Sequence, residues 1–360
     1  MALKRIVLII LLFEPLLLLF AQVPNIYQNT YNYIDKMLTD EIPLSFKDAV
    51  FATENTFENG SLDLDMLNNE IITLVQLSNI ISNSGLIEYQ GKDKDYITKH
   101  AALFEVFTDS IIIPFDSTHI FIHFPYSYDF DDPFGQKEWS SMFVSKLLET
   151  GKGNCHSLPY LYKILADELK IPCHLAFAPN HIYIKSYAES TGWYNTELTS
   201  ATFPTDAWIM ASGYISIDAI RNGLYMDTLS TTQAVANCLV DLAQGYQRKF
   251  GKENPEFVIK CCNTALKYHP SNVNAMLTKA EAQKHYIDLQ MKKQNAKKVE
   301  DLFSDTAIAE IYSDMEQTYV LLHQLGYRRM PEKMYLEWID LLKNEPSKYV
   351  NKNVQTVQKK

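Results

Sequence analysis

The sequence lacks an excess of basic residues. Its 33 Lys and Arg residues are outnumbered by 43 Asp and Glu residues, and the formal net charge is −10. A protein that binds nucleic acid needs a basic face to neutralise phosphates. We therefore expect no nucleic-acid partner, and the charge gives no reason to expect attraction to an anionic membrane.

Cysteine is also scarce, with five residues in 360. An odd number without framework spacing does not predict a disulfide scaffold, so at least one thiol should be free. Adjacent cysteines also bridge each other poorly for geometric reasons. We expect Cys155 to be the free, reactive thiol of the set Cys155, Cys173, Cys238, Cys261 and Cys262.

Long apolar runs are missing after the first 21 residues. Near the start, Lys4 and Arg5 precede an apolar stretch that ends at Phe20, and the small residue Ala21 follows. This pattern predicts a signal peptide over residues 1–21, with an uncleaved anchor as the alternative. We therefore expect an exported protein, periplasmic or secreted, with no stable membrane span after cleavage.

The remaining chain is rich enough in apolar residues to fold. Hydrophobic residues make up 47% of it, and its length allows two or three domains. The pattern is mainly helical up to residue 116, mixed through the middle, and helical again from Thr232. We predict an N-terminal helical region over 22–116, a core domain over 117–230, a helical region over 231–347 and a flexible tail over 348–360.

The C-terminal helical region contains a pattern typical of helix-pair repeats. Leu242, Ala243 and Tyr246 resemble the first helix of a tetratricopeptide repeat, and Val258 and Cys262 fit its second helix. A plain helical bundle is the alternative. This region is the expected surface for a protein partner.

No motif predicts a metal or a cofactor. His119 and His123 lie four residues apart on a predicted strand, whereas neighbours on one strand face lie two apart. Structural roles for both histidines are therefore expected, with no metal site.

Chemistry-bearing residues gather between Gly151 and Thr199. Leu158, Leu161 and Leu165 follow Cys155 at helical spacing, and the run ends before Pro172. Cys155 would then lie in the first turn of a helix, where unpaired N–H groups and the positive helix end favour a thiolate. Gly151 and Gly153 would allow close backbone approach without crowding the thiol.

Two alternating strands follow this helix. One begins at His181, and the other runs from Trp193 to Thr199. If the hairpin is centred near Glu189, His181 lies directly opposite Glu197. Opposed side chains are about 5 Å apart at Cβ, so the carboxylate could orient the imidazole.

These three side chains predict a nucleophilic site. Cys155 would attack a carbonyl carbon, His181 would accept and later return a proton, and Glu197 would fix the imidazole tautomer. The backbone N–H of Cys155 would supply one oxyanion donor. The second donor is not identified, with Trp139 and Gln136 as upstream candidates.

The motifs around these residues resemble a known family. The run Gly153-Asn154-Cys155-His156-Ser157-Leu158, together with Ile171-Pro172, His181 and Trp193-x-x-x-Glu197, is similar to the bacterial transglutaminase-like superfamily. The resemblance covers about 66 residues, from Trp139 to Pro204.

The resemblance implies an α+β fold with a papain-like core, in which a helix packs on an antiparallel sheet. It also implies a Cys–His–Asp triad, and Glu197 stands where the family usually has Asp. We therefore expect a cysteine-dependent peptidase or acyltransferase that acts on a peptide or protein substrate. Some members of the family are inactive, so a protein-binding module without catalysis is the alternative.

Overall fold

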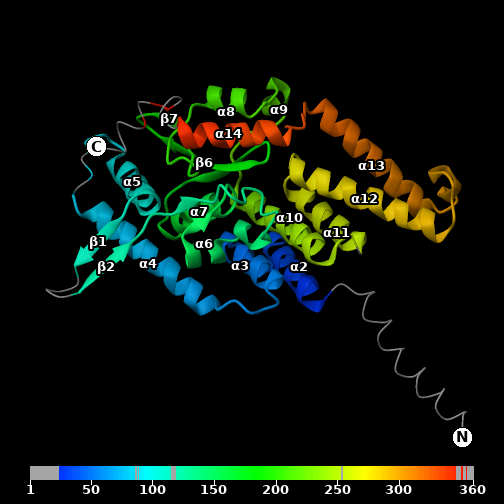
Figure 1. The fold of residues 1–360 in the computed structure, drawn as a ribbon, viewed down its shortest axis with the longest axis horizontal. Coiled ribbons are helices and arrows are strands. Elements are labelled where there is room, and N and C mark those ends of the chain that lie inside the picture. Colours follow the sequence, from blue (N-terminus) through cyan, green and yellow to red (C-terminus); the bar gives the residue numbers. More distant parts are fainter. Residues whose placement is uncertain are drawn as a thin grey trace, which may run out of the picture. The chain divides into compact units, whose positions relative to one another are not determined.

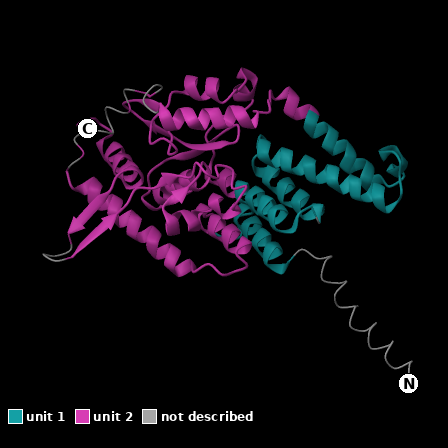
Figure 2. Cartoon of the chain, in the orientation of Figure 1, with its two compact units in different colours: residues 1–43, 236–319 teal, residues 44–235, 320–360 magenta. Residues whose placement is uncertain are grey.

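The computed structural model describes residues 24–85, 87, 89–114, 119–252, 254–345, 350–351 and 354. The predicted signal peptide lies outside these residues. The described chain belongs to the α+β class, with many helices and small sheets (Figure 1). It divides into two compact units, which are coloured separately in Figure 2.

The chain passes between the two units more than once. One unit combines the described residues up to Pro43 with Ala236–Tyr319, and the other combines Leu44–Val235 with the chain from Val320. This division differs from the predicted domains over 22–116, 117–230 and 231–347. Consecutive segments do not form the units, because side chains far apart in sequence share one core.

The first unit is helical. The ring of Tyr27 in α2 packs edge-on against Tyr246 and Phe257, with centroids 5.2 and 6.2 Å apart. The hydroxyl of Tyr31 shares a hydrogen bond of 2.8 Å with Thr264. Its complete elements are α2 (Asn25–Leu38), α11 (Pro255–Tyr268), α12 (Val273–Lys293) and η2 (Val299–Leu302), while α10 (Thr231–Phe250) and α13 (Thr306–Gln324) cross its boundaries.

The second unit is built around α7 (Ser157–Glu168). Every residue of α7 from Ser157 to Ala166 is buried, which is typical of a helix surrounded by other elements. Helix α7 contacts strands β5 and β6 and helices α4, α5 and α6. The helices of this unit are α3 (Phe46–Phe57), α4 (Leu64–Asn83), α5 (Lys94–Thr108), η1 (Trp139–Met142), α6 (Val144–Thr150), α8 (Asp206–Ser212), α9 (Ile217–Arg221) and α14 (Glu332–Asn344).

An antiparallel sheet of three strands lies against α7. Its order is β5 (His174–Ala178), β6 (His181–Ala188) and β7 (Gly192–Thr196). The β6–β7 hairpin is centred at residue 190, one position later than predicted, because Ala188 pairs with Gly192 across a three-residue turn. The expected direct pairing of His181 with Glu197 is therefore wrong, and β7 ends before Glu197.

Four further strands form two small pairs. In the first pair His123 is buried, and its Nε2 lies 2.7 Å from the carbonyl oxygen of Val106. This contact fixes the imidazole on helix α5 and gives it a structural role. The pairs are β1 (Ile111–Pro114) with β2 (Ile120–His123), antiparallel, and β3 (Ser127–Tyr128) with β4 (Lys152–Gly153), parallel.

Residues 139–150 form two short helical elements. Element η1 and helix α6 are separated by Phe143, whose backbone is extended. The buried carboxylate of Glu54 accepts hydrogen bonds from the backbone N–H groups of Val144 (2.7 Å) and Ser145 (2.9 Å). Those groups are free to bond Glu54 only because they begin a new helix.

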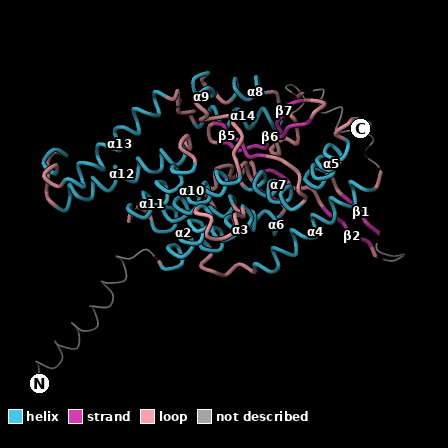
Figure 3. Tube along the Cα trace, turned by 180° about the vertical axis from the view of Figure 1, so that it is seen from behind, coloured by secondary structure: helices cyan, strands magenta, loops and turns pink. Residues whose placement is uncertain are grey.

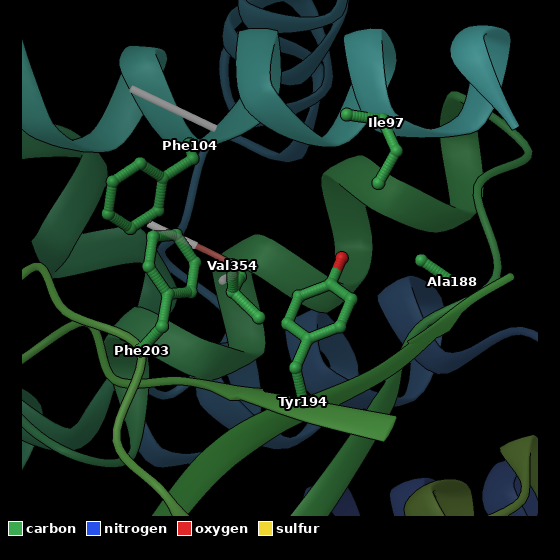
Figure 4. Packing of buried hydrophobic residues seen from close by; sticks show 6 residues of the cluster. All are labelled: Ile97, Phe104, Ala188, Tyr194, Phe203 and Val354. Atoms are coloured by element: carbon green, nitrogen blue, oxygen red, sulfur yellow. The ribbon is translucent and has the colours of Figure 1, made fainter. Parts of the chain in front are cut away.

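The C-terminal tail, predicted to be flexible over 348–360, contributes to the core at its described residues. Val350 pairs with Pro204, and the N–H of Asn351 donates to Phe203. Val354 is 1% exposed and packs with Tyr194 and other apolar side chains from α5 and β6 (Figure 4). Apolar burial therefore anchors this part of the chain.

Candidate active site

The chain enters the site through a turn that needs glycine. Gly151 ends α6 with a φ of 69°, in the left-handed region. Gly153 allows a close approach to α7, because a Cβ at this position would lie 2.5 Å from Ser157 Oγ. This differs from the expected role of Gly153, since the space it leaves faces Ser157 of the helix.

Cys155 lies just before α7 and not in its first turn as predicted. The N–H of Asn154 donates to Ser157 Oγ, while Asn154 Oδ1 accepts from the N–H groups of His156 and Ser157. This reciprocal arrangement fixes the backbone on both sides of Cys155. The thiol is consequently held at the N-terminal end of a buried helix.

His181 and Glu197 form a direct hydrogen bond. Nε2 of His181 donates to Oε2 of Glu197 over 2.6 Å, and the N–H of Thr199 donates to Oε1 over 2.9 Å. A register shift of two residues keeps Glu197 on the same face of the sheet as His181. The predicted contact therefore forms diagonally, although the predicted register does not.

The other ring nitrogen of His181 is not used by Glu197. Nδ1 is buried and makes no well-aligned hydrogen bond with any residue that the structure describes. The thiol and the imidazole nevertheless interact closely enough to shift each other's pKa. The structure thus brings together all three predicted residues, Cys155, His181 and Glu197.

The electrostatics of the site favour charged side chains despite their burial. Burial raises the pKa of the Cys155 thiol, but the hydrogen bond and charge of His181 lower it by more. Burial lowers the pKa of His181, while the charge of Glu197 and the hydrogen bonds to Cys155 and Glu197 raise it to about 10. Burial raises the pKa of Glu197, and the charge of His181 and its hydrogen bond bring that pKa below the ordinary value.

Two aromatic side chains from helix α14 cover these residues. The Tyr335 hydroxyl lies 3.2 Å from Cys155 Sγ and 3.5 Å from the Tyr128 hydroxyl. The Trp338 ring packs edge-on against His181, with centroids 4.7 Å apart. Figures 1 and 3 show α14 beside β6 from opposite sides.

The sequence predicted a helix at these positions but not its place at the site. Tyr335 is 180 residues from Cys155, and an aromatic pair at helical spacing indicates only an apolar face. The turn residue Asn180 was also not predicted as a contact, although its carbonyl oxygen accepts from Cys155 Sγ over 3.6 Å. Gln136 is exposed, and its backbone N–H donates to the carboxylate of Asp132 over 2.7 Å.

The arrangement provides a nucleophile, a base and an orienting carboxylate within one buried cluster. A hydrogen bond from Nε2 to Glu197 leaves Nδ1 of His181 as the ring position that can accept the thiol proton. Within the described residues, no group of His, Cys, Asp and Glu side chains is arranged to hold a metal ion. None of the five cysteines is in a disulfide.

Comparison with protein-family models, curated proteins and solved structures found no match to this chain. Among the described helices, none combines the length and apolar character needed to cross a bilayer. The functional argument therefore depends on the geometry of the site.

Proposed function

We propose that this chain is a cysteine-dependent acyl-transfer enzyme, a peptidase or acyltransferase, acting on peptide or amide bonds. Cys155 Sγ attacks the carbonyl carbon, and its proton moves to Nδ1 of His181. The resulting tetrahedral intermediate expels the amine, which takes that proton from His181. Water or a second amine then attacks the thioester and releases the acyl group.

The observation that carries this proposal is the position of His181 between an acid and a thiol. Its Nε2 is committed to Glu197 at 2.6 Å, and its Nδ1 remains for Cys155. Glu197 stabilises the imidazolium that forms when the thiol is deprotonated. A buried cysteine with no functional partner would have a raised pKa, as Cys173 does at about 12, whereas the pKa of Cys155 is lowered.

The start of α7 provides a place for the oxyanion. The positive end of the helix dipole favours negative charge there. The backbone N–H of Cys155, which lies two residues before the first residue of α7, is the proposed donor. The transglutaminase-like resemblance of the surrounding motif supports the same reaction class.

A second candidate is a protein-binding module that performs no chemistry. Its support is the closure of the site, since Cys155 is 6% exposed and His181 is 3% exposed. A substrate cannot contact the thiol in this arrangement. The two candidates differ in whether the thiol is activated when a reagent does gain access.

The pH profile of alkylation separates the candidates. Iodoacetamide labelling of Cys155 is followed by mass spectrometry between pH 5 and 8 in the intact chain. Opening of the site changes the labelling rate by the same factor at every pH. The slope of the rate with pH therefore reports the fraction of Cys155 that is thiolate. An ordinary thiol would label about tenfold faster per pH unit over this range.

The enzyme proposal predicts a nearly flat profile for Cys155 and an ordinary slope after His181→Ala or Glu197→Gln. Glu189→Gln, in the exposed turn between β6 and β7, is the matched control and should leave the profile flat. Acyl adducts from a p-nitrophenyl ester should form on Cys155 and survive Cys173→Ala. An ordinary slope in the intact chain would overturn the proposal and favour the binding module.

A further inference from the structure

Helix α14 presents one apolar face to the candidate site. The side chains on this face are almost fully buried, with Tyr335 at 0%, Trp338 at 2% and Leu342 at 4% exposure. Leu336 and Leu341, on the remainder of the helix, are 43% and 37% exposed. The buried face of α14 is therefore the one that covers Cys155 and His181.

Tyr335 occupies the position that a reacting carbonyl would need. Its hydroxyl oxygen lies 3.2 Å from Cys155 Sγ. A carbonyl carbon must approach a nucleophile to about 3–3.5 Å before a bond forms. A substrate carbonyl consequently cannot reach the thiol while the Tyr335 hydroxyl occupies this position.

The two aromatic side chains of α14 pack against the rings of other residues. The Tyr335 ring packs on Phe134 with centroids 4.7 Å apart. Trp338 lies between His181 and Trp208, with centroids 4.7 and 6.0 Å away. These surroundings suit large aromatic side chains in general, because ring edges and faces meet at favourable distances.

A cavity of about 340 Å³ borders the same helix. Its walls include Tyr128 and Leu158 near the thiol and Thr199 beside Glu197, while α14 contributes Leu342 and Lys343. Because α14 forms one wall, its movement would join this cavity to the space in front of Cys155. The open groove would then give part of a polypeptide access to the thiol.

The seated helix leaves a polar group without a partner. Nε1 of Trp338 is buried and makes no hydrogen bond with any described residue. A buried unpaired donor or acceptor is destabilising relative to a hydrated one. At the N-terminal end of α14, Pro331 supplies no side-chain cap. Both features lower the free energy needed to displace α14.

We propose that α14 is an internal occupant of the substrate groove, displaced by a polypeptide that presents large aromatic side chains. This inference rests on the proposed function, since it names the regulation and substrate class of the Cys155 site. In the resting chain, Tyr335 and Trp338 occupy the sites that such a polypeptide would take. The thiol becomes accessible only when α14 leaves.

The test compares two leucines that are neighbours in α14. Leu342→Ala shortens a side chain that is buried in the core of the second unit. Leu341→Ala shortens a side chain of the same kind that is exposed. In the full chain, Leu342→Ala should increase the rate of Cys155 labelling by about tenfold or more, because the open form is more populated. Leu341→Ala should leave the rate within about twofold of the unmodified chain.

Two measurements keep the result specific. Cys173 lies in the same unit and is only 2% exposed. Its labelling therefore reports unfolding of the whole unit and should stay slow in both variants. A synthetic peptide with the sequence of residues 331–345 should slow Cys155 labelling in the Leu342→Ala chain. The same peptide with Tyr335→Ala and Trp338→Ala should not.

Each outcome decides between the two proposals. Rapid labelling of Cys155 in the intact chain, equal rates in both leucine variants, or no protection by the peptide would overturn the role of α14. The pH slope measured on the Leu342→Ala chain decides the proposed function separately. Faster labelling of Cys155 with an ordinary pH slope would support the role of α14 as a cover of the thiol. It would overturn the proposed enzyme, and with it the inferred substrate class.

Discussion

Two buried carboxylates in this protein have pKa shifts of opposite sign. Glu197 faces the imidazole of His181, whose charge outweighs burial and lowers the pKa of the carboxyl. Burial raises the pKa of Glu54 to about 7, because its hydrogen bonds to Val144 and Ser145 and the charge of His156 offset burial only in part. Burial alone therefore does not determine whether a carboxyl group is protonated, because the charges of its neighbours also favour one of the two forms.

The Glu197–His181 pair stabilises the fold over a defined pH range. The pKa of Glu197 is depressed, so its contribution is present above its ordinary pKa and disappears as pH falls through the folded value. The pKa of His181 is raised to about 10, so its contribution is complete below its ordinary pKa and disappears as pH rises through about 10. The full contribution is thus expected in mildly acidic solution, between about pH 4.5 and 6.5.

Glu54 should make the chain less stable as pH rises. Its folded pKa of about 7 exceeds the ordinary value of 4.5, so the folded chain holds its proton where the unfolded chain has lost it. The free energy of unfolding should fall by about 3 kcal/mol between pH 4.5 and 7 from this group alone. Urea unfolding of the intact chain and of Glu54→Gln at several pH values measures the difference.

The control for Glu54 is Glu58→Gln, at the end of the same helix and only partly buried. It should keep the pH dependence of the intact chain, while Glu54→Gln should lose it. Glu54→Gln should also be less stable at acidic pH, because its amide cannot accept from both backbone N–H groups of α6. Parallel stability curves for the intact chain and Glu54→Gln would contradict this account.

The elements nearest the thiol were predictable because their signals are local. The spacing of Leu158, Leu161 and Leu165 predicted α7, and alternation predicted the two strands that follow it. The register failed because the turn contains three residues before Gly192, whose φ of 73° the sequence does not specify. The predicted contact of His181 with Glu197 still forms, because a register shift of two residues keeps both side chains on the same face of the sheet.

The positions of α14 and Phe143 could not be predicted in the same way. Helix α14 has a clear apolar face, but periodicity does not indicate which surface receives it. The break at Phe143 depends on Glu54, which is 90 residues away from Val144 in sequence. Both features are decided by tertiary contacts between distant segments, which local patterns do not encode.

Gly153 should be necessary for packing between β4 and α7. A Cβ at this position would lie 2.5 Å from Ser157 Oγ and 3.0 Å from Leu147 Cδ1. Gly153→Ala is therefore expected to lower the free energy of unfolding by about 1–3 kcal/mol, through overpacking. It should also disturb the Asn154–Ser157 hydrogen bond and change the labelling rate of Cys155.

Gly151→Ala is the comparison for Gly153→Ala. Nothing lies within 4 Å of the position that its Cβ would take, but its φ is 69°. Its cost of about 1 kcal/mol should come from backbone strain, with little effect on the thiol. Thermal unfolding and Cys155 labelling of both variants separate the two causes; equal labelling changes would argue against a packing role for Gly153.

The described part of the chain forms two units from interleaved segments. The second unit needs residues from Val320 onward, which supply both α14 and the buried Val354. Its core is therefore incomplete until distant parts of the chain have come together. Sequence patterns show where elements lie along the chain and not which core they join, so they do not predict this interleaving.

Val354 should contribute to the stability of the second unit. Val354→Ala removes apolar contacts with Phe104 and its neighbours and should lower the free energy of unfolding by about 2 kcal/mol. Val320→Ala is the matched control, because Val320 is 56% exposed in α13. Urea unfolding measures both, and equal losses would show that the chain around Val354 does not belong to the core.

The separation between Cys155 and Tyr335 also has a consequence during synthesis. The ribosome completes Tyr335 180 residues after Cys155. At about 5–20 residues per second, this interval lasts roughly 10–40 s. A nascent chain therefore carries the thiol for that time before the hydroxyl that covers it has been made, and newly synthesised protein would be the most exposed to oxidants and electrophiles.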